Sequence, residues 1–267
     1  MPTLPVPDRC IWCLQQPPDV PFEEAPILPA SVGASRQRIL PPGVVCRRCA
    51  GYFTGKVEPA LLADPLFHAT AAFLGLADRD DMNEFRDRLF DEAHRPVDRP
   101  ERKLDLGAAI REEEGELTVY VAYTIQGRLS RAYTRGELAL LSRAIHRIAF
   151  ESLAWHLYVA GEGLEEPLDP FASVFEPVRA WARQGKPRSA VRPVLRCPGR
   201  STAAQFETKP WRLGRAVGIE IDLFGDWYGV ALTSKPSDAL KDLRAWAGEG
   251  AEELWCLAET IRSLGGS

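Results

Sequence analysis

The chain has 267 residues, which at about 150 residues per domain suggests two domains or one large one. Its composition (45% hydrophobic, 26% charged, 21 glycines, 22 prolines) fits a turn-rich globular protein and excludes collagen, a coiled coil and a disordered chain. The 33 basic and 37 acidic residues give a net charge of −4, so any surface for nucleic acid has to be local. No apolar run approaches the ~20 residues that cross a bilayer, and no signal peptide is evident. We therefore expect a cytoplasmic protein with no membrane partner.

Two Cys-x-x-Cys pairs lie near the N-terminus, Cys10-Ile11-Trp12-Cys13 and Cys46-Arg47-Arg48-Cys49. Each pair lets two thiolates converge from one tight turn, and two such turns supply the four soft ligands that tetrahedral Zn²⁺ prefers. A reducing cytosol disfavours a disulfide. The spacing predicts a structural zinc, with buried thiols or a redox dithiol as the alternatives. Cys197 and Cys256 have no neighbouring Cys or His, so we expect packed or partly exposed thiols there.

The segment around these cysteines resembles the four-cysteine branch of the HNH, or His-Me finger, endonucleases. The resemblance extends over about a quarter of the chain. Besides the first cysteine pair, it is carried by residues 25–33, by residues 43–53 and by the helical segments 57–62 and 64–67. It implies that residues 1–76 form a small ββα-type module held together by zinc.

The reactive positions of that family are altered in this chain. Family members carry a Glu-His pair on a strand and an Asn after the second cysteine pair, and the His acts as general base beside a divalent ion. Here the pair falls on Ala25-Pro26 and the Asn on Ala50. Since loss of a general base alone costs ~10²–10⁴ in rate, we assign no catalytic residue. An active nuclease would need Glu23, Glu24 or His68 as a substitute, with Mg²⁺ or Mn²⁺ as cofactor.

After this module, the charged, proline-interrupted residues 77–101 predict a short helix and an exposed connector. A second domain is expected over residues 102–267. Its first elements are two β-type runs, Leu104–Ile110 and Leu117–Ile125, which predict a hairpin. The turn between them, residues 111–116, contains three consecutive glutamates that we expect in a solvated loop.

A capping box at Thr134 and Glu137 begins the strongest helical pattern. Arg143 and Arg147 on this helix are expected to face solvent, and His146 and His156 do not converge on one ion. A second helix is predicted between Asp169 and Gly185. The long helix is expected to bury one face, which carries Leu138, Leu141, Ile145, Ile148, Ser152, Trp155 and Val159; the second would bury Val174, Val178, Trp181 and Ala182.

The C-terminal part combines a second hairpin with helices. Val217–Phe224 and Trp227–Thr233 predict the hairpin. Ser237-Asp238 would cap one helix, and a further helix is expected between Gly250 and Gly265. Strand pairs and helices without a βαβ rhythm indicate the α+β class.

Residues 171–215 hold ten basic and two acidic residues, a local balance of +8. Pro193 and Pro198 exclude one continuous helix, so we expect an extended or looped strip that neutralises phosphates, with a tryptophan stacked on a base. The alternative is that these charges pair with acidic residues elsewhere in the protein. With two arginines from the second cysteine pair, the nucleic-acid candidates are Arg47, Arg48, Arg183, Arg188, Arg192, Arg196 and Trp211.

The sequence therefore favours a bacterial cytoplasmic protein that binds DNA or RNA, or joins a multi-subunit complex, through an HNH-like module without nuclease activity. The resemblance implies a defence or mobile-element context. Two alternatives stay open: an active, divalent-metal-dependent nuclease, and a zinc-stapled scaffold for protein interactions.

Overall fold

The computed structural model contains helices and antiparallel sheets, which confirms the α+β class. It describes residues 4–29, 38–64, 108–113, 116–121, 123–124, 128–129, 135–161, 168–186, 191–197, 206–223, 226–248 and 255–256. None of the helices in these ranges is long and apolar enough to cross a membrane.

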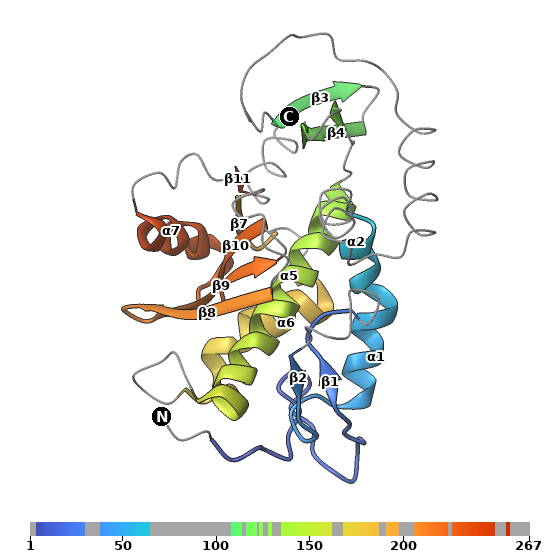
Figure 1. Cartoon of the computed structure of the whole chain (residues 1–267), viewed down its shortest axis with the longest axis vertical. Helices are drawn as coiled ribbons and strands as arrows, with labels where there is room; N and C mark the ends of the chain where they lie inside the picture. Colours follow the sequence, from blue (N-terminus) through green and yellow to red (C-terminus); the bar gives the residue numbers. More distant parts are fainter. Residues whose placement is uncertain are drawn as a thin grey trace.

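A five-stranded antiparallel sheet, in the order β11-β7-β10-β9-β8, is the largest β element (Figure 1). The predicted second hairpin is confirmed: β9 pairs with β10 from Leu223 opposite Asp226 to Gly218 opposite Ala231. The extended geometry expected for the basic strip is confirmed in β7. The strands are β7 (Val194–Cys197), β8 (Phe206–Leu213), β9 (Ala216–Leu223), β10 (Asp226–Ala231) and β11 (Trp255–Cys256).

Both edges of this sheet differ from the sequence-based expectation. β11 lies inside the segment predicted as a helix, because Trp255 and Cys256 pair with Arg196 and Leu195 of β7. β8 was not predicted, since Pro210 interrupts its β-type pattern. An edge strand tolerates proline because one side of its backbone needs no ladder donor.

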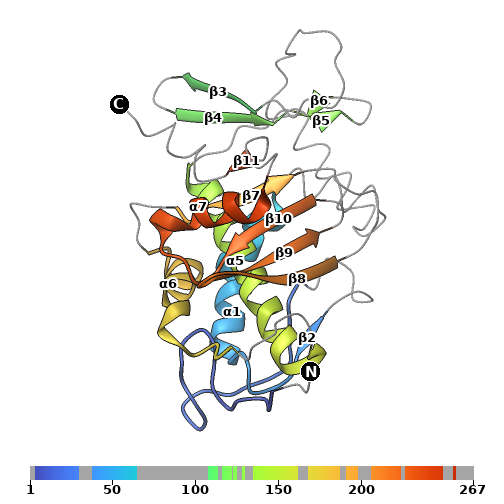
Figure 2. The same ribbon diagram turned by 90° about the vertical axis from the view of Figure 1, so that its left-hand side faces the viewer.

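Helix α5 (Arg135–Trp155) lies between the sheet and the N-terminal module, and α7 (Pro236–Ala247) lies on the opposite face of the sheet (Figures 1 and 2). The expectation that α5 buries only one face is wrong. Between Leu141 and Ala154 every residue except Arg143 is buried, because the N-terminal module covers Arg147 and Glu151 while the C-terminal part covers Ser142. A π-helical segment, His156–Ala160, continues the helix.

Three stacked indoles fix α7 to the sheet. Trp246 of α7 stacks on Trp211 at 4.9 Å and on Trp227 at 5.7 Å between ring centroids. A Cβ at Gly218 would meet the Trp211 ring at 2.1 Å, so only glycine permits this approach. The predicted Ser237-Asp238 cap is wrong: the helix starts at Pro236, and no side chain caps it.

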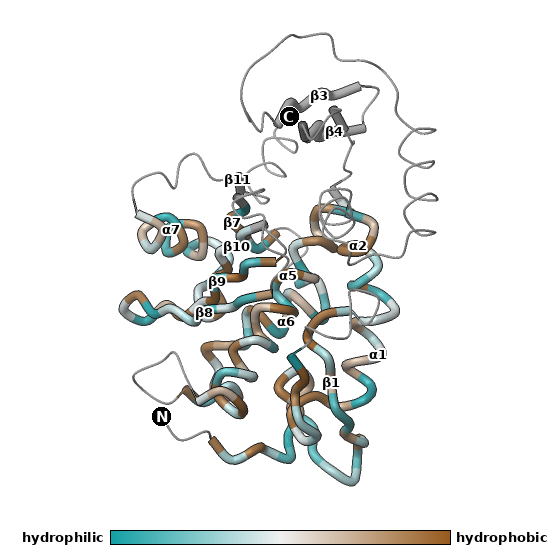
Figure 3. Tube along the Cα trace, in the orientation of Figure 1, coloured by the Kyte–Doolittle hydropathy of each residue, from teal (hydrophilic) through white to brown (hydrophobic). Residues whose placement is uncertain are grey.

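The N-terminal module has the expected order of two strands followed by a helix. β1 (Ala25–Pro26) pairs with β2 (Ile39–Leu40), and α1 (Arg47–Lys56) and α2 (Glu58–Leu62) follow. The hydropathy colouring of Figure 3 shows hydrophilic residues at the start of α1. The division of the chain at residues 76 and 101 stays a prediction.

The predicted helix after Asp169 is α6 (Glu176–Gln184), preceded by a 3₁₀ turn, Ser173–Phe175. Val178, Trp181 and Ala182 are buried as expected. Val174 is not, since 51% of it is exposed on the 3₁₀ turn, where the helical period does not apply.

The predicted first hairpin is also confirmed, with β3 (Ala108–Glu113) paired to β4 (Glu116–Val121). A short pair, β5 (Tyr123–Thr124) and β6 (Arg128–Leu129), follows. The expected glutamate loop is shorter than predicted, because the first two of the three glutamates extend β3. The helix expected after Asp64, the connector, Thr134, His68 and Arg188 lie outside the described residues.

Candidate metal centre

The four cysteines of the two pairs come together in one cluster. Their sulfur atoms all lie within 4.8 Å of one another, and Cys13 Sγ is 3.6 Å from Cys46 Sγ. Zinc–sulfur bonds of about 2.3 Å in a tetrahedron require sulfurs roughly 3.8 Å apart. The predicted ligand set is therefore arranged to bind a metal ion.

Two backbone turns hold these sulfurs. In the first, the Leu14 amide donates to the Cys10 carbonyl at 2.9 Å, with Leu14 in a left-handed conformation (φ 62°). In the second, Cys46 is the N-cap of α1, and its carbonyl accepts from the Ala50 amide at 3.0 Å. The Cys46 amide also donates to Cys10 Sγ at 3.4 Å. The two turns thus share one site.

The electrostatics of the cluster favour a cation. A hydrogen bond from the Cys49 thiol lowers the pKa of Cys10 to about 5, against the effect of burial. Burial raises the pKa of Cys46 to about 11, and the hydrogen bond to Cys10 raises that of Cys49 far above its ordinary value. Without a metal, one thiolate therefore suppresses ionisation of its neighbours. A divalent ion would allow all four sulfurs to ionise.

With four protein sulfurs as ligands, such an ion would have no open coordination position. Three of the cysteines are fully buried, and only Cys13 is partly accessible. The donor set fits structural zinc. An ion bound by all four sulfurs would leave no place for a substrate and would act as a structural ion.

An arginine of α5 binds the backbone at Pro26 and Ile27, next to the position where the resemblance to HNH endonucleases would place the Glu-His pair. Arg147 donates from Nη1 to the Ile27 carbonyl at 2.6 Å and from Nη2 to the Pro26 carbonyl at 2.8 Å. Glu24 is exposed, and Glu23 is an exposed partner of Arg47 at 3.7 Å. The Glu58 carboxylate pairs with the same Arg147 Nη1 at 3.0 Å, so it is engaged in a buried ion pair.

Arg147 was expected to face solvent, but in the structure it belongs to a buried charge network. Its guanidinium pairs with Glu58 at 3.0 Å and with Glu151 at 2.9 Å. The Trp12 indole donates to the same Glu151 carboxylate at 2.9 Å. Burial raises the pKa of Glu151 to about 7, although Arg147 and Trp12 oppose that shift. The i,i+4 spacing of Arg147 and Glu151 was the available signal, but it is equally typical of an exposed helix.

Arg143 is likewise not a solvated side chain. It donates to the Tyr52 hydroxyl at 2.6 Å and to the carbonyls of Ala182 and Arg183 at 3.1 Å. It therefore connects α1 with the C-terminal end of α6.

Two arginines of the expected basic strip are fully buried. Arg192 donates to the carbonyls of Ala231 and Ser234 at 2.8 Å. Arg196 pairs with Asp64 at 3.1 Å and lies over the Tyr228 ring. Neither can reach a phosphate in this fold, so both leave the list of nucleic-acid candidates. The alternative interpretation of the strip, pairing with acidic residues elsewhere in the protein, holds for Arg196, whereas Arg192 binds backbone carbonyls instead.

The other nucleic-acid candidates differ in how far their side chains are exposed to solvent. Trp211 is 6% exposed and has one ring face on Trp246 and the other against Gly218, so it offers no face to a base. Arg183 is half-buried, whereas Arg47 and Arg48 are exposed on α1. Those two remain the accessible cations of the predicted set among the described residues.

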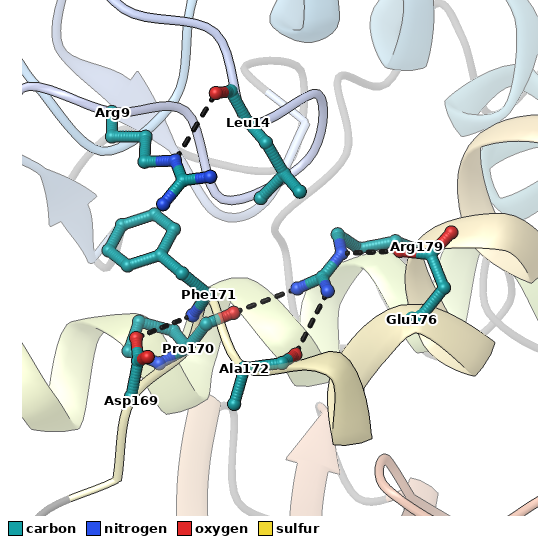
Figure 4. Close-up of polar contacts among 8 residues, drawn as sticks. All are labelled: Arg9, Leu14, Asp169, Pro170, Phe171, Ala172, Glu176 and Arg179. Atoms are coloured by element: carbon teal, nitrogen blue, oxygen red, sulfur yellow. Dashed lines mark hydrogen bonds and ion pairs between the residues drawn. The ribbon is translucent and has the colours of Figure 1, made fainter.

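The first cysteine turn makes a second contact with the C-terminal part (Figure 4). Arg9 donates to the Leu14 carbonyl at 3.2 Å, and its guanidinium lies 5.1 Å from the centre of the Phe171 ring. The Asp169 carboxylate accepts from the Phe171 amide, and Arg179 binds the carbonyls on either side of Phe171, those of Pro170 and Ala172. The loop that receives Arg9 is therefore held in place before α6 begins.

His146 of α5 and His156 of the π-helical segment do not converge, as expected. His146 contacts the Ser142 carbonyl at 2.7 Å, and His156 contacts Thr208 of β8 at 3.0 Å. Burial, together with the charge of Arg192, lowers the pKa of His146 to about 3. His146 is therefore neutral in the folded protein.

The depressed pKa of His146 predicts acid sensitivity. Below pH 6.5 the unfolded chain binds a proton that the folded protein binds only near pH 3, so stability present above pH 6.5 is lost as the pH falls. Between pH 6.5 and pH 3, the free energy of unfolding of the wild-type protein should fall by up to about 1.4 kcal/mol per pH unit more than that of His146→Gln. Urea unfolding of both proteins across this range measures the difference. Parallel pH profiles would contradict the assignment.

Comparison of the chain with models of protein families, with curated proteins and with solved structures finds no significant match. The metal centre therefore rests on its own geometry.

Proposed function

We propose that this protein binds nucleic acid through a zinc-stapled, HNH-like module that performs no hydrolysis. The observation that carries the proposal is the combination, within one module, of a closed four-cysteine site and an exposed basic helix. The residues Ala25 and Pro26 support the absence of nuclease chemistry, because neither side chain has a titratable group where the resemblance places the general base.

The outer face of α1 has the character of a phosphate-binding surface. Arg47, Arg48 and Lys56 are exposed there. Between them Gly51 and Gly55 face open space, since a Cβ added at either glycine would meet no heavy atom within 4 Å. A glycine in a helix interior is about 1 kcal/mol less favourable than an alanine. In return, the missing side chains allow a phosphate backbone to approach the helix closely. Cations around such a surface supply the affinity for DNA or RNA.

Replacing Arg47 and Arg48 together by serine should weaken binding to a short duplex or single strand. Each phosphate contact contributes about 0.9 to the slope of log K against log salt for duplex DNA, so loss of two should lower its magnitude by roughly 1.8. Fluorescence anisotropy over a salt series, with labelled DNA and RNA oligonucleotides, measures both effects.

The matched control is Lys235→Ser with Lys241→Ser, which removes two exposed positive charges from the N-cap and outer face of α7. Its affinity and salt slope should equal those of the wild type. An equal loss of affinity in both double variants would show that binding depends only on the net charge of the protein. No binding by the wild type to any oligonucleotide would favour the protein-interaction scaffold.

A further inference from the structure

Trp12 connects the metal centre with helix α5. It lies between the two ligands of the first cysteine pair and is 2% exposed. Its ring packs on Phe53 of α1 at 4.7 Å and on Phe150 of α5 at 5.1 Å, and its indole N–H donates to Glu151 of α5. One four-residue turn therefore supplies two sulfur ligands and a hydrogen bond to the long helix.

The charges on this side of α5 depend on the N-terminal module. In the part of the chain that the structure describes, the polar partners of Arg147 and Glu151 are each other, Trp12, Glu58 and the carbonyls of residues 26 and 27. Both side chains are at least 96% buried. If the module separated from α5, both would lose every partner except each other, and a buried charge with few partners is strongly unfavourable.

We propose that metal binding by the four cysteines and docking of the N-terminal module on α5 form one coupled equilibrium, with Trp12 as the connecting residue. The metal-bound turn presents Trp12 to Glu151 and keeps the network closed. Loss of the metal frees the turn, withdraws the indole and releases the module from Arg147 and Glu151. The C-terminal part thereby senses whether the metal site is filled, and this coupling holds whether or not the protein binds nucleic acid.

Such coupling is reciprocal, because two linked equilibria affect each other by the same factor. A substitution at Glu151, 139 residues from Trp12 in sequence, should therefore weaken metal binding although Glu151 contributes no ligand. Mutation of groups that orient metal ligands from outside the coordination sphere typically lowers metal affinity about 10–100-fold.

The test compares zinc affinity, by competition with a chromophoric chelator, in Glu151→Gln and Trp12→Phe. Trp12→Phe keeps an aromatic ring between Phe53 and Phe150 and removes the indole donor together with part of the ring. The chain offers a matched control, because the Trp227 indole donates to Glu220 at 3.4 Å in the sheet, away from the cysteines. We expect a loss of about tenfold or more in both test variants and wild-type affinity in Glu220→Gln and Trp227→Phe. Wild-type affinity in the two test variants would overturn the proposal.

Amide hydrogen exchange provides the second readout, on wild-type protein with and without a chelator. We expect the amides of α1, α2 and the part of α5 around Arg147 and Glu151 to lose protection on metal removal, while those of β9 and β10 keep theirs. Unchanged protection in α5, or equal loss in α5 and the sheet, would overturn the coupling.

Discussion

Cys49→Ser is expected to abolish metal binding and unfold the N-terminal module. The serine hydroxyl does not replace a thiolate as a soft zinc ligand. Structural zinc contributes about 10–16 kcal/mol of apparent binding free energy in small zinc domains, which exceeds the total stability of many domains, about 5–15 kcal/mol. Elemental analysis should find about one metal ion per wild-type chain and none in the variant. Thermal melts followed by circular dichroism should show an early transition for the variant.

Cys256→Ser is the control, since it removes a cysteine that lies on β11, at the edge of the five-stranded sheet. Its metal content should equal that of the wild type. A Cys49→Ser protein that keeps its metal, or melts as the wild type does, would show that the cluster is not a structural metal site.

Glu151→Ala is expected to destabilise the protein by up to about 3–5 kcal/mol, because it removes one of the two carboxylates that compensate the buried charge of Arg147 and leaves Glu58 as the other. Arg147 would lose its 2.9 Å partner, and the Trp12 indole would lose its acceptor. Equilibrium unfolding in urea at neutral pH measures the change.

Two comparisons make this result specific. Glu207→Ala changes an exposed glutamate on β8 and should alter stability by less than about 0.5 kcal/mol. A triple variant with apolar residues at Glu58, Arg147 and Glu151 should recover most of the loss, since it leaves no unpaired charge in the interior. If Glu151→Ala and Glu207→Ala were equally stable, the network would have no structural importance.

Features that depend only on residues close together in the chain could be predicted from the sequence. The Cys-x-x-Cys spacing identified the metal-ligand set, because each pair needs only one tight turn to present its two sulfurs. The hairpins β3–β4 and β9–β10 and helix α5 were predicted for the same reason. Their periodicity reports local backbone geometry and extends over only a few residues.

Features that depend on contacts between residues far apart in the chain became visible only in the tertiary structure. Arg147, Arg192 and Arg196 have the sequence pattern of solvated or phosphate-binding cations, yet the fold surrounds them with carbonyls and carboxylates. β11 forms a strand only because β7 lies beside it. Local spacing therefore determined the candidate metal ligands, and local periodicity determined most element types. The contact between Trp12 and Glu151, 139 residues apart, was decided by packing, which no local pattern records.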